Sequence, residues 1–438
     1  MLYFINAILT IILILSIYKD YKKYNILFVA DSNKLSFIMW TVTLILYNLS
    51  LSNLYNPDLY INLLVLPIVI IFFIGSRIIC IKNDNIGKLV NRFYEENWEN
   101  VYGKLSIVFL IIAIISLGIN FKINGIAILS ENKINKQSIT TLGYGVFIAV
   151  IAAQIQYLIY RKNKRIKNLL LCSIAVICSG LTLSRGPLFY FVLTVFIFEI
   201  YNLYFLKIHC KHGIRNIKIK VLAIIFIFIF AFNYVGNIRN KYVMDNFFHH
   251  TLNEHYMMKK NYPTAFTQLY IYLTSPLENA RFSIENQSVE NMYFNELLYP
   301  IVKFNANIIG EGNRYKEWID NKQQYIPYLD DLVGLNVSSF IVDAFNDYGY
   351  LGYLVYMFLF FLLSISLIKL INSNKHSSVF NILLYSNALN FLLWNVFVNS
   401  FKVGTQYIYI VCFIFCEFFY KIKKSKYSLK LRRRKKCL

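Results

Sequence analysis

Long apolar segments alternate with short polar ones along most of the chain, a pattern that predicts membrane-spanning helices. A bilayer core of about 30 Å is crossed by about 20 apolar helical residues. Eleven segments approach this length, at roughly 2–18, 35–54, 59–81, 104–121, 139–160, 168–184, 187–206, 218–236, 341–370, 378–399 and 404–420. We therefore predict an all-α, polytopic membrane protein with about eleven transmembrane helices.

One long hydrophilic segment, residues 237–340, interrupts this alternation. It is rich in aromatic residues, so we expect it to fold against the membrane surface rather than to be disordered. Within it, 264–273 is predicted to form an amphipathic helix with Phe266, Leu269, Tyr270 and Leu273 on one face. The expected organisation is an N-terminal bundle of about eight helices (1–236), this large loop (237–340), three further helices (341–420) and a basic tail (421–438).

The composition supports a membrane protein and sets its orientation. Only 16% of the residues are charged, whereas 57% are hydrophobic, too few charges to cover the surfaces of soluble domains. The net charge of +22 comes from short basic clusters between apolar segments, such as 161–165 and 432–436. This distribution follows the positive-inside rule and does not indicate nucleic-acid binding. It places the N-terminus and the long loop outside the cytoplasmic membrane and the C-terminus in the cytoplasm.

Two arginines are expected at the outer ends of helices. Arg185, after Ser184, is the only charge in a very short outer turn, and Arg239 opens the long loop just after Gly236. A guanidinium group stays charged and binds phosphate oxygens in pairs, so two of them could hold a pyrophosphate and stabilise it as a leaving group. The alternative for Arg185 is a snorkelling side chain that only marks the turn.

Two carboxylates lie where the ninth predicted helix begins. Asp343 and Asp347 are four residues apart and so share one face of a helix. They could act as a general base, pair with an arginine, or simply complement the helix N-terminus. Asn336, Arg281 and Ser184 are further polar candidates for substrate contact. No nucleotide-binding or metal-ligand pattern is present, so we expect neither a cofactor nor a metal.

Several of these motifs together resemble the O-antigen polymerase (Wzy-type) family of oligosaccharide repeat unit polymerases. The resemblance covers the helical layout with one large outer loop in its C-terminal half. It is carried by Ser184-Arg185-Gly186, by Gly236 with Arg239, by the segment 272–279 (YLTSPLEN), and by Asp347-Tyr348-Gly349 followed by Gly352.

The resemblance implies an enzyme of surface-polysaccharide synthesis at the outer face of the cytoplasmic membrane. Such an enzyme transfers a growing glycan from undecaprenyl pyrophosphate onto the next lipid-linked repeat unit, beside a flippase and a chain-length regulator as protein partners. Arg185 and Arg239 would bind the donor pyrophosphate, and Asp347, or else Asp343, would orient or deprotonate the acceptor hydroxyl. The alternatives are an O-antigen ligase-like transferase and a polysaccharide flippase or transporter.

Overall fold

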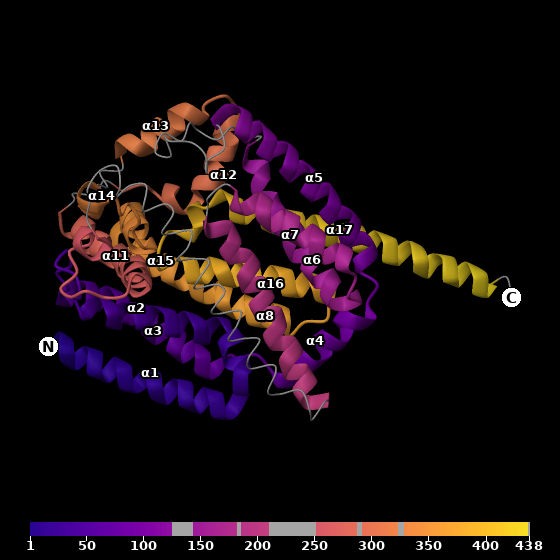
Figure 1. Ribbon diagram of the computed structural model, residues 1–438, viewed down its shortest axis with the longest axis horizontal. Coiled ribbons are helices and arrows are strands. Elements are labelled where there is room, and N and C mark those ends of the chain that lie inside the picture. Colours follow the sequence, from indigo (N-terminus) through magenta and orange to yellow (C-terminus); the bar gives the residue numbers. More distant parts are fainter. Residues whose placement is uncertain (125–142, 182–184, 210–250, 287–290, 323–327, 437–438) are drawn as a thin grey trace. The chain divides into compact units, whose positions relative to one another are not determined.

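The chain is helical in the computed structural model, which describes residues 1–124, 143–181, 185–209, 251–286, 291–322 and 328–436 (Figure 1). Arg239 and Ser184 lie outside these residues, as does the predicted span 218–236. The chain divides into two compact units, each built from segments that are distant in sequence. Unit 1 comprises Met1–Ile81, Ile229–Ile368 and Phe391–Gly404, and unit 2 comprises Lys82–Phe228, Lys369–Asn390 and Thr405–Leu438.

Unit 1 joins the first three helices to the described part of the predicted outer loop. Its helices are α1 (Leu2–Tyr24), η1 (Asn25–Ala30), α2 (Ser32–Asn48), α3 (Leu59–Ile78), α10 (Leu252–His255), α11 (Thr264–Asn286), α12 (Asn295–Ile308), α13 (Gly312–Lys322), α14 (Tyr328–Val333), most of α15 (Phe340–Ile371) and η3 (Ser400–Lys402). The helices α1, α2 and α3 pack side by side (Figure 1).

Aspartates begin two of these helices. The carboxylate of Asp31 accepts the N–H groups of Asn33 and Lys34 at the start of α2, and Asp58 accepts that of Ile61 at the start of α3. The first N–H groups of a helix have no partner within it, so a carboxylate there satisfies them and complements the helix dipole.

Unit 2 contains α4 (Asn83–Glu95), α5 (Glu99–Asn124), η2 (Gly143–Ile148), α6 (Ala149–Asn163), α7 (Ile166–Gly180), α8 (Arg185–His209), most of α16 (Ser378–Trp394) and nearly all of α17 (Gly404–Lys436). The amphipathic helix α4 buries Ile86, Leu89, Val90 and Phe93. Their spacing of three or four residues places these side chains on one face, whereas α5 and α7 are apolar on nearly all sides.

Six described helices are long and apolar enough to cross a membrane: Leu2–Ala30, Leu59–Ile78, Glu99–Ile123, Gly186–Leu206, Phe340–Ile371 and Gly404–Ser425. Each coincides with a predicted span. Two more apolar helices, Ile166–Gly180 and Ser378–Trp394, are shorter. The exposed face of α1 carries Tyr3, Phe4, Ile11 and Ile14, as a lipid-facing helix requires. The prediction of a helical membrane protein is therefore confirmed, whereas the count of eleven spans stays a prediction.

The predicted amphipathic helix at 264–273 exists, and it is part of a longer helix. It is the first half of α11, in which Tyr270 and Leu273 are buried, whereas Phe266 and Leu269 are exposed. Thr267, Gln268, Thr274, Glu278 and Asn279 are buried instead. The four predicted apolar residues therefore share one face of a helix, but only two of them are buried. Polar side chains of α11 find hydrogen-bond partners inside unit 1, which hydrophobic periodicity does not reveal.

The ion pairs of the described residues agree with the predicted topology. In unit 1, Asp20 pairs with Lys34 and Arg77, all expected on the inner side. Arg281 pairs with Asp58, both expected on the outer side. In unit 2, the pairs Arg161–Glu199 and Lys162–Glu99 join inner segments. No ion pair among the described residues joins an expected inner segment to an expected outer one.

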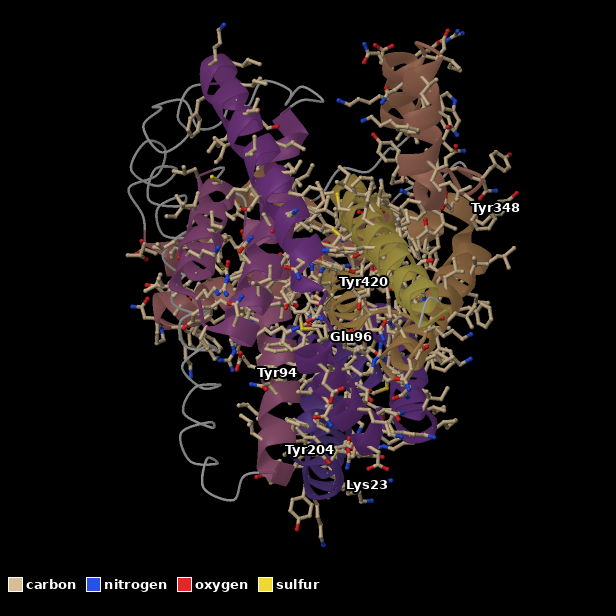
Figure 2. The ribbon with its side chains drawn as sticks, turned by 90° about the vertical axis from the view of Figure 1, so that its right-hand side faces the viewer. Lys23, Tyr94, Glu96, Tyr204, Tyr348 and Tyr420 are labelled. Atoms are coloured by element: carbon tan, nitrogen blue, oxygen red, sulfur yellow. The ribbon has the colours of Figure 1, made fainter. Side chains whose placement is uncertain are left out.

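The helix α15 is kinked near its start. Tyr348 (φ −159°, ψ 34°) and Gly349 (φ 56°, ψ −136°) depart from helical backbone angles. The ring of Tyr348, which is labelled in Figure 2, packs against two aromatic rings, those of Tyr293 and Phe294. A Cβ atom on Gly352 would collide with the carbonyl oxygen of Ala344. The two glycines therefore permit the bend and the close backbone approach beside it.

We expect Gly349→Ala to lower the free energy of unfolding by roughly 1–3 kcal/mol, because its backbone conformation is strained for any residue with a Cβ atom. No atom lies within 4 Å of the added methyl group, so the effect would be conformational rather than steric. Gly118→Ala in α5, which also has open space, should be neutral or stabilising. Thermal unfolding in detergent measures the difference in melting temperature between the two variants. Equal melting temperatures would contradict the prediction.

Candidate functional site

A half-buried lysine and two carboxylates form the centre of the site in unit 1, which we call the Lys402 cluster. The Lys402 Nζ atom lies 2.5 Å from Glu296 Oε2 and 3.2 Å from Asp343 Oδ1. The Glu296 side chain is fully buried, whereas that of Asp343 is 15% exposed. The cluster therefore carries one more negative than positive charge, and Asp343 is its more accessible acid.

A short turn places Lys402 beside α15. Asn399 begins the turn, since its side-chain oxygen accepts the N–H of Phe401, and the side chain of Asn395 accepts the N–H of Ser400. The N–H of Phe340, the first residue of α15, donates to the carbonyl oxygen of Asn395. These hydrogen bonds fix the turn against the start of α15, where Asp343 occupies the first turn of the helix.

Asp347 holds the neighbouring helix in place. Its two carboxylate oxygens accept the N–H groups of Glu296 and Leu297, each at 3.0 Å, and Oδ2 also accepts the hydroxyl of Tyr356 at 2.7 Å. These N–H groups belong to the first turn of α12, whose own preceding residue, Phe294, provides no side-chain cap. Asp347 therefore caps α12 from a different helix and fixes the backbone that carries Glu296.

The opposing charges determine the protonation of Lys402. Burial alone would lower the pKa of its ammonium group, but Asp343 and Glu296 outweigh burial and raise the pKa above its usual value. Lys402 therefore stays positively charged.

Three stacked aromatic rings extend from this cluster. The Nζ atom of Lys402 lies 5.8 Å from the ring centroid of Tyr299. Tyr299 stacks on Tyr315 at 6.1 Å, and Tyr315 stacks on Trp318 at 6.0 Å. The rings come from α12 and α13, which pack together (Figure 1). Trp318 is 37% exposed, so this aromatic ladder (Tyr299, Tyr315 and Trp318) runs from the buried cluster to the surface of unit 1.

Arg281 lies in a separate ion-pair network of unit 1. Its guanidinium nitrogens donate to Glu278 at 2.6 Å and 3.1 Å and to Glu285 at 2.5 Å, and Asp58 lies 3.9 Å away. Burial alone would lower the pKa of Arg281, but its bonds to Glu278 raise it. With three carboxylates around one guanidinium, the geometry favours a scaffolding role for Arg281 over the substrate contact that the sequence suggested.

The other predicted site residues fall in different surroundings. The backbone of Arg185 starts α8 in unit 2, and its side chain is outside the described structure, so the predicted pyrophosphate clamp with Arg239 stays a prediction. Asn336 has an exposed side chain. The carbonyl groups on either side of it, those of Leu335 and Val337, accept hydrogen bonds from the Asn279 amide, which fixes this segment against α11.

Sequence reasoning missed Lys402 and Glu296. Lys402 is the only charge in the very short segment between the predicted spans 378–399 and 404–420. The argument that singled out Arg185 in its own short turn therefore applies equally to Lys402. Nothing comparable marks Glu296, which lies among other polar residues of the long loop and meets Lys402 only in the folded chain.

Comparisons with known proteins leave the site to be interpreted from its own chemistry. No protein-family model, curated protein or solved structure matches this chain.

Proposed function

We propose that the chain is a membrane-embedded glycosyltransferase that polymerises lipid-linked oligosaccharide repeat units of a surface polysaccharide. The observation that carries this proposal is the carboxylate of Asp343, held by Lys402 at one end of an exposed aromatic ladder. A partly accessible carboxylate can take the proton of a hydroxyl group, and aromatic faces can pack on sugar rings.

In the proposed reaction, Asp343 is the general base. The acceptor hydroxyl oxygen forms a bond to the anomeric carbon of the donor glycan and loses its proton to Asp343. The bond from that carbon to the pyrophosphate oxygen breaks, and undecaprenyl pyrophosphate leaves with the electron pair. Lys402 binds Oδ1 of Asp343, whereas Oδ2 makes no hydrogen bond with any residue that the structure describes. Oδ2 is therefore available to the acceptor.

Asp343 suits the role of base better than the other two carboxylates near Lys402. Asp347 is fully buried and its oxygens are occupied by two backbone N–H groups and a tyrosine hydroxyl. Glu296 is also fully buried. We therefore assign the base to Asp343 and a positioning role to Asp347, the reverse of the order that the family resemblance suggested.

The predicted topology supports an extracytoplasmic reaction. Asp343, Glu296 and Lys402 all come from segments that the distribution of basic residues places outside. In the same proposal, Arg185 and Arg239 bind the donor pyrophosphate, whose negative charge grows as the anomeric bond breaks.

We expect Asp343→Asn to slow chain extension about 10²–10⁴-fold, the usual contribution of a general base, without unfolding the protein. Lys402 would still be paired with Glu296, so the substitution leaves no unpaired buried charge. The measurement is the rate at which polymers of increasing length form when the purified protein is placed in vesicles containing lipid-linked repeat units. Asp84→Asn, at an exposed position in α4, is the matched control and should retain the full rate.

Two results would overturn the proposal. A folded Asp343→Asn variant with the wild-type rate would remove the assigned base. If the wild-type protein transfers a finished polymer to a different acceptor and does not lengthen chains one repeat unit at a time, it would instead be a ligase.

A further inference from the structure

A small cavity lies in unit 1 against the two turns of α15 that also carry Asp343. Its volume is about 220 Å³, and its walls come from α3, α11, the residues before α12, and α15. This is below the roughly 300–1,000 Å³ of pockets that enclose a drug-sized molecule. The cavity therefore has room for a single small ring rather than for a whole oligosaccharide.

The polar groups of this cavity are neutral. Tyr60, Ser283, Asn291 and Asn346 contribute hydroxyl and amide groups, Val342 and Phe345 contribute apolar surface, and none of the described lining residues is charged. Hydroxyl and amide groups both donate and accept hydrogen bonds, as sugar hydroxyls do. The lining matches an uncharged, hydroxylated ring and has no cation for a phosphate.

Two of these groups are buried without a partner. Ser283 is 1% exposed, and its Oγ atom makes no hydrogen bond with the described residues. Asn346 is 5% exposed, and its side-chain amide likewise has no partner within the described ranges. Buried polar groups are nearly always hydrogen-bonded, so the unsatisfied Ser283 hydroxyl, in a cavity that Asn346 also lines, calls for an explanation. A bound ligand that supplies the missing partners is such an explanation.

The walls are fixed by contacts outside the cavity. Arg281 on α11 pairs with Asp58, two residues before Tyr60. The N–H of Met292 donates to the carbonyl oxygen of Asn346 at 2.9 Å, which holds the segment before α12 against α15. A site whose polar groups are held in place in this way loses little conformational entropy when a ligand binds.

We propose that this cavity is the subsite for one neutral sugar ring of the acceptor, with Ser283 and Asn346 as its hydrogen-bonding residues. The inference rests on the proposed glycosyltransferase function and specifies where that enzyme holds its acceptor. Val342 and Asn346 lie within three residues of Asp343 on α15, so a ring held here is bound by the part of the helix that carries the proposed base.

Ser283→Ala provides the decisive test because it separates binding from folding. Since the Ser283 hydroxyl has no partner among the described residues, its removal should leave the melting temperature of the ligand-free protein unchanged or raise it. It should weaken ring binding about three- to tenfold, the loss of one hydrogen bond. Asn346→Leu should weaken binding at least as much while its backbone bond to Met292 persists.

Ser36→Ala is the matched control. Ser36 is another buried serine of unit 1 whose Oγ has no partner among the described residues, and it does not line the cavity. This variant should show the same change in melting temperature as Ser283→Ala but no change in binding. The binding probes are methyl glycosides of glucose, galactose and N-acetylglucosamine, detected by saturation-transfer NMR on the full-length protein, and the KM for the acceptor is measured in the vesicle assay.

The outcomes distinguish this subsite from the reaction itself. Chain extension with an unchanged acceptor KM in both Ser283→Ala and Asn346→Leu would overturn the subsite and leave the proposed function standing. If the wild-type protein binds the sugar probes but extends no chain, and both variants lose this binding, the subsite would be supported and the proposed function overturned. Absence of probe binding to the wild-type protein, together with an unchanged KM in the variants, would also reject the subsite.

Discussion

Lys402→Met should be among the most destabilising single substitutions in this protein. It would leave Glu296 fully buried without a countercharge, next to Asp343. Removing one partner of a buried ion pair typically costs about 3–5 kcal/mol. Because the Lys402 side chain is 23% exposed, we expect the lower end of that range, about 3 kcal/mol. Fluorescence-detected size-exclusion chromatography after heating would show this as a lower melting temperature.

A second substitution and a control test the cause of this loss. Lys402→Met combined with Glu296→Gln removes the unpaired buried charge and should recover most of the lost stability, giving a coupling energy in a double-mutant cycle. The control is Lys303→Met. Lys303 is a lysine of α12 that contacts the Tyr299 hydroxyl but makes no ion pair within the described structure, so its substitution should change the melting temperature little. Equal melting temperatures for Lys402→Met and Lys303→Met would show that the ion pair contributes nothing.

Arg281→Met should be comparably destabilising. Glu278 has a side chain that is only 1% exposed, and besides Arg281 it accepts the hydroxyl of Tyr47 at 2.5 Å and the N–H of Asn56 at 3.2 Å. Without Arg281 these neutral donors would have to stabilise a buried carboxylate alone, so we again expect a loss of about 3–5 kcal/mol. The thermal unfolding assay used for Lys402 measures it.

The same variant decides whether Arg281 is a scaffold or an anion ligand. If it is a scaffold, Arg281→Met combined with Glu278→Gln should restore both stability and chain extension. If it binds the pyrophosphate, stability would return and chain extension would not. Arg314→Met is the control, because Arg314 is 84% exposed and lies 3.6 Å from a half-exposed Glu311. Such a surface pair contributes at most about 1 kcal/mol.

Hydrophobic patterning predicted much of the fold because lipid-facing helices are apolar along their length. The six long apolar helices were all located from the sequence. Five of them begin and end within about five residues of the predicted boundaries, whereas Leu2–Ala30 continues well past its predicted end at residue 18. The same patterning located the first half of α11 and its apolar face, but it did not reveal that the helix continues to Asn286 or that it buries Thr267, Glu278 and Asn279. These polar side chains find hydrogen-bond partners inside unit 1, and hydrophobic periodicity carries no information about such partners.

The candidate site was predicted only in part. Asp343 and Asp347 were identified because carboxylates at the start of an apolar helix are conspicuous, but their different roles were not apparent. Asp347 caps α12, whose first turn lies about fifty residues earlier in the chain. A cap that comes from a distant helix leaves no local signal, because local capping patterns span only three or four residues.

The sequence by itself determined the class of the protein, its apolar helices and its expected orientation, because hydropathy and charge act on each segment independently of the rest of the chain. Only the tertiary structure decided which charges meet. Lys402, Glu296 and Asp343 come from three separate segments, and whether each carboxylate is accessible, paired or used as a cap depends on distances that packing alone sets. The strength of a charge interaction depends on separation and burial, and neither can be read from position along the chain.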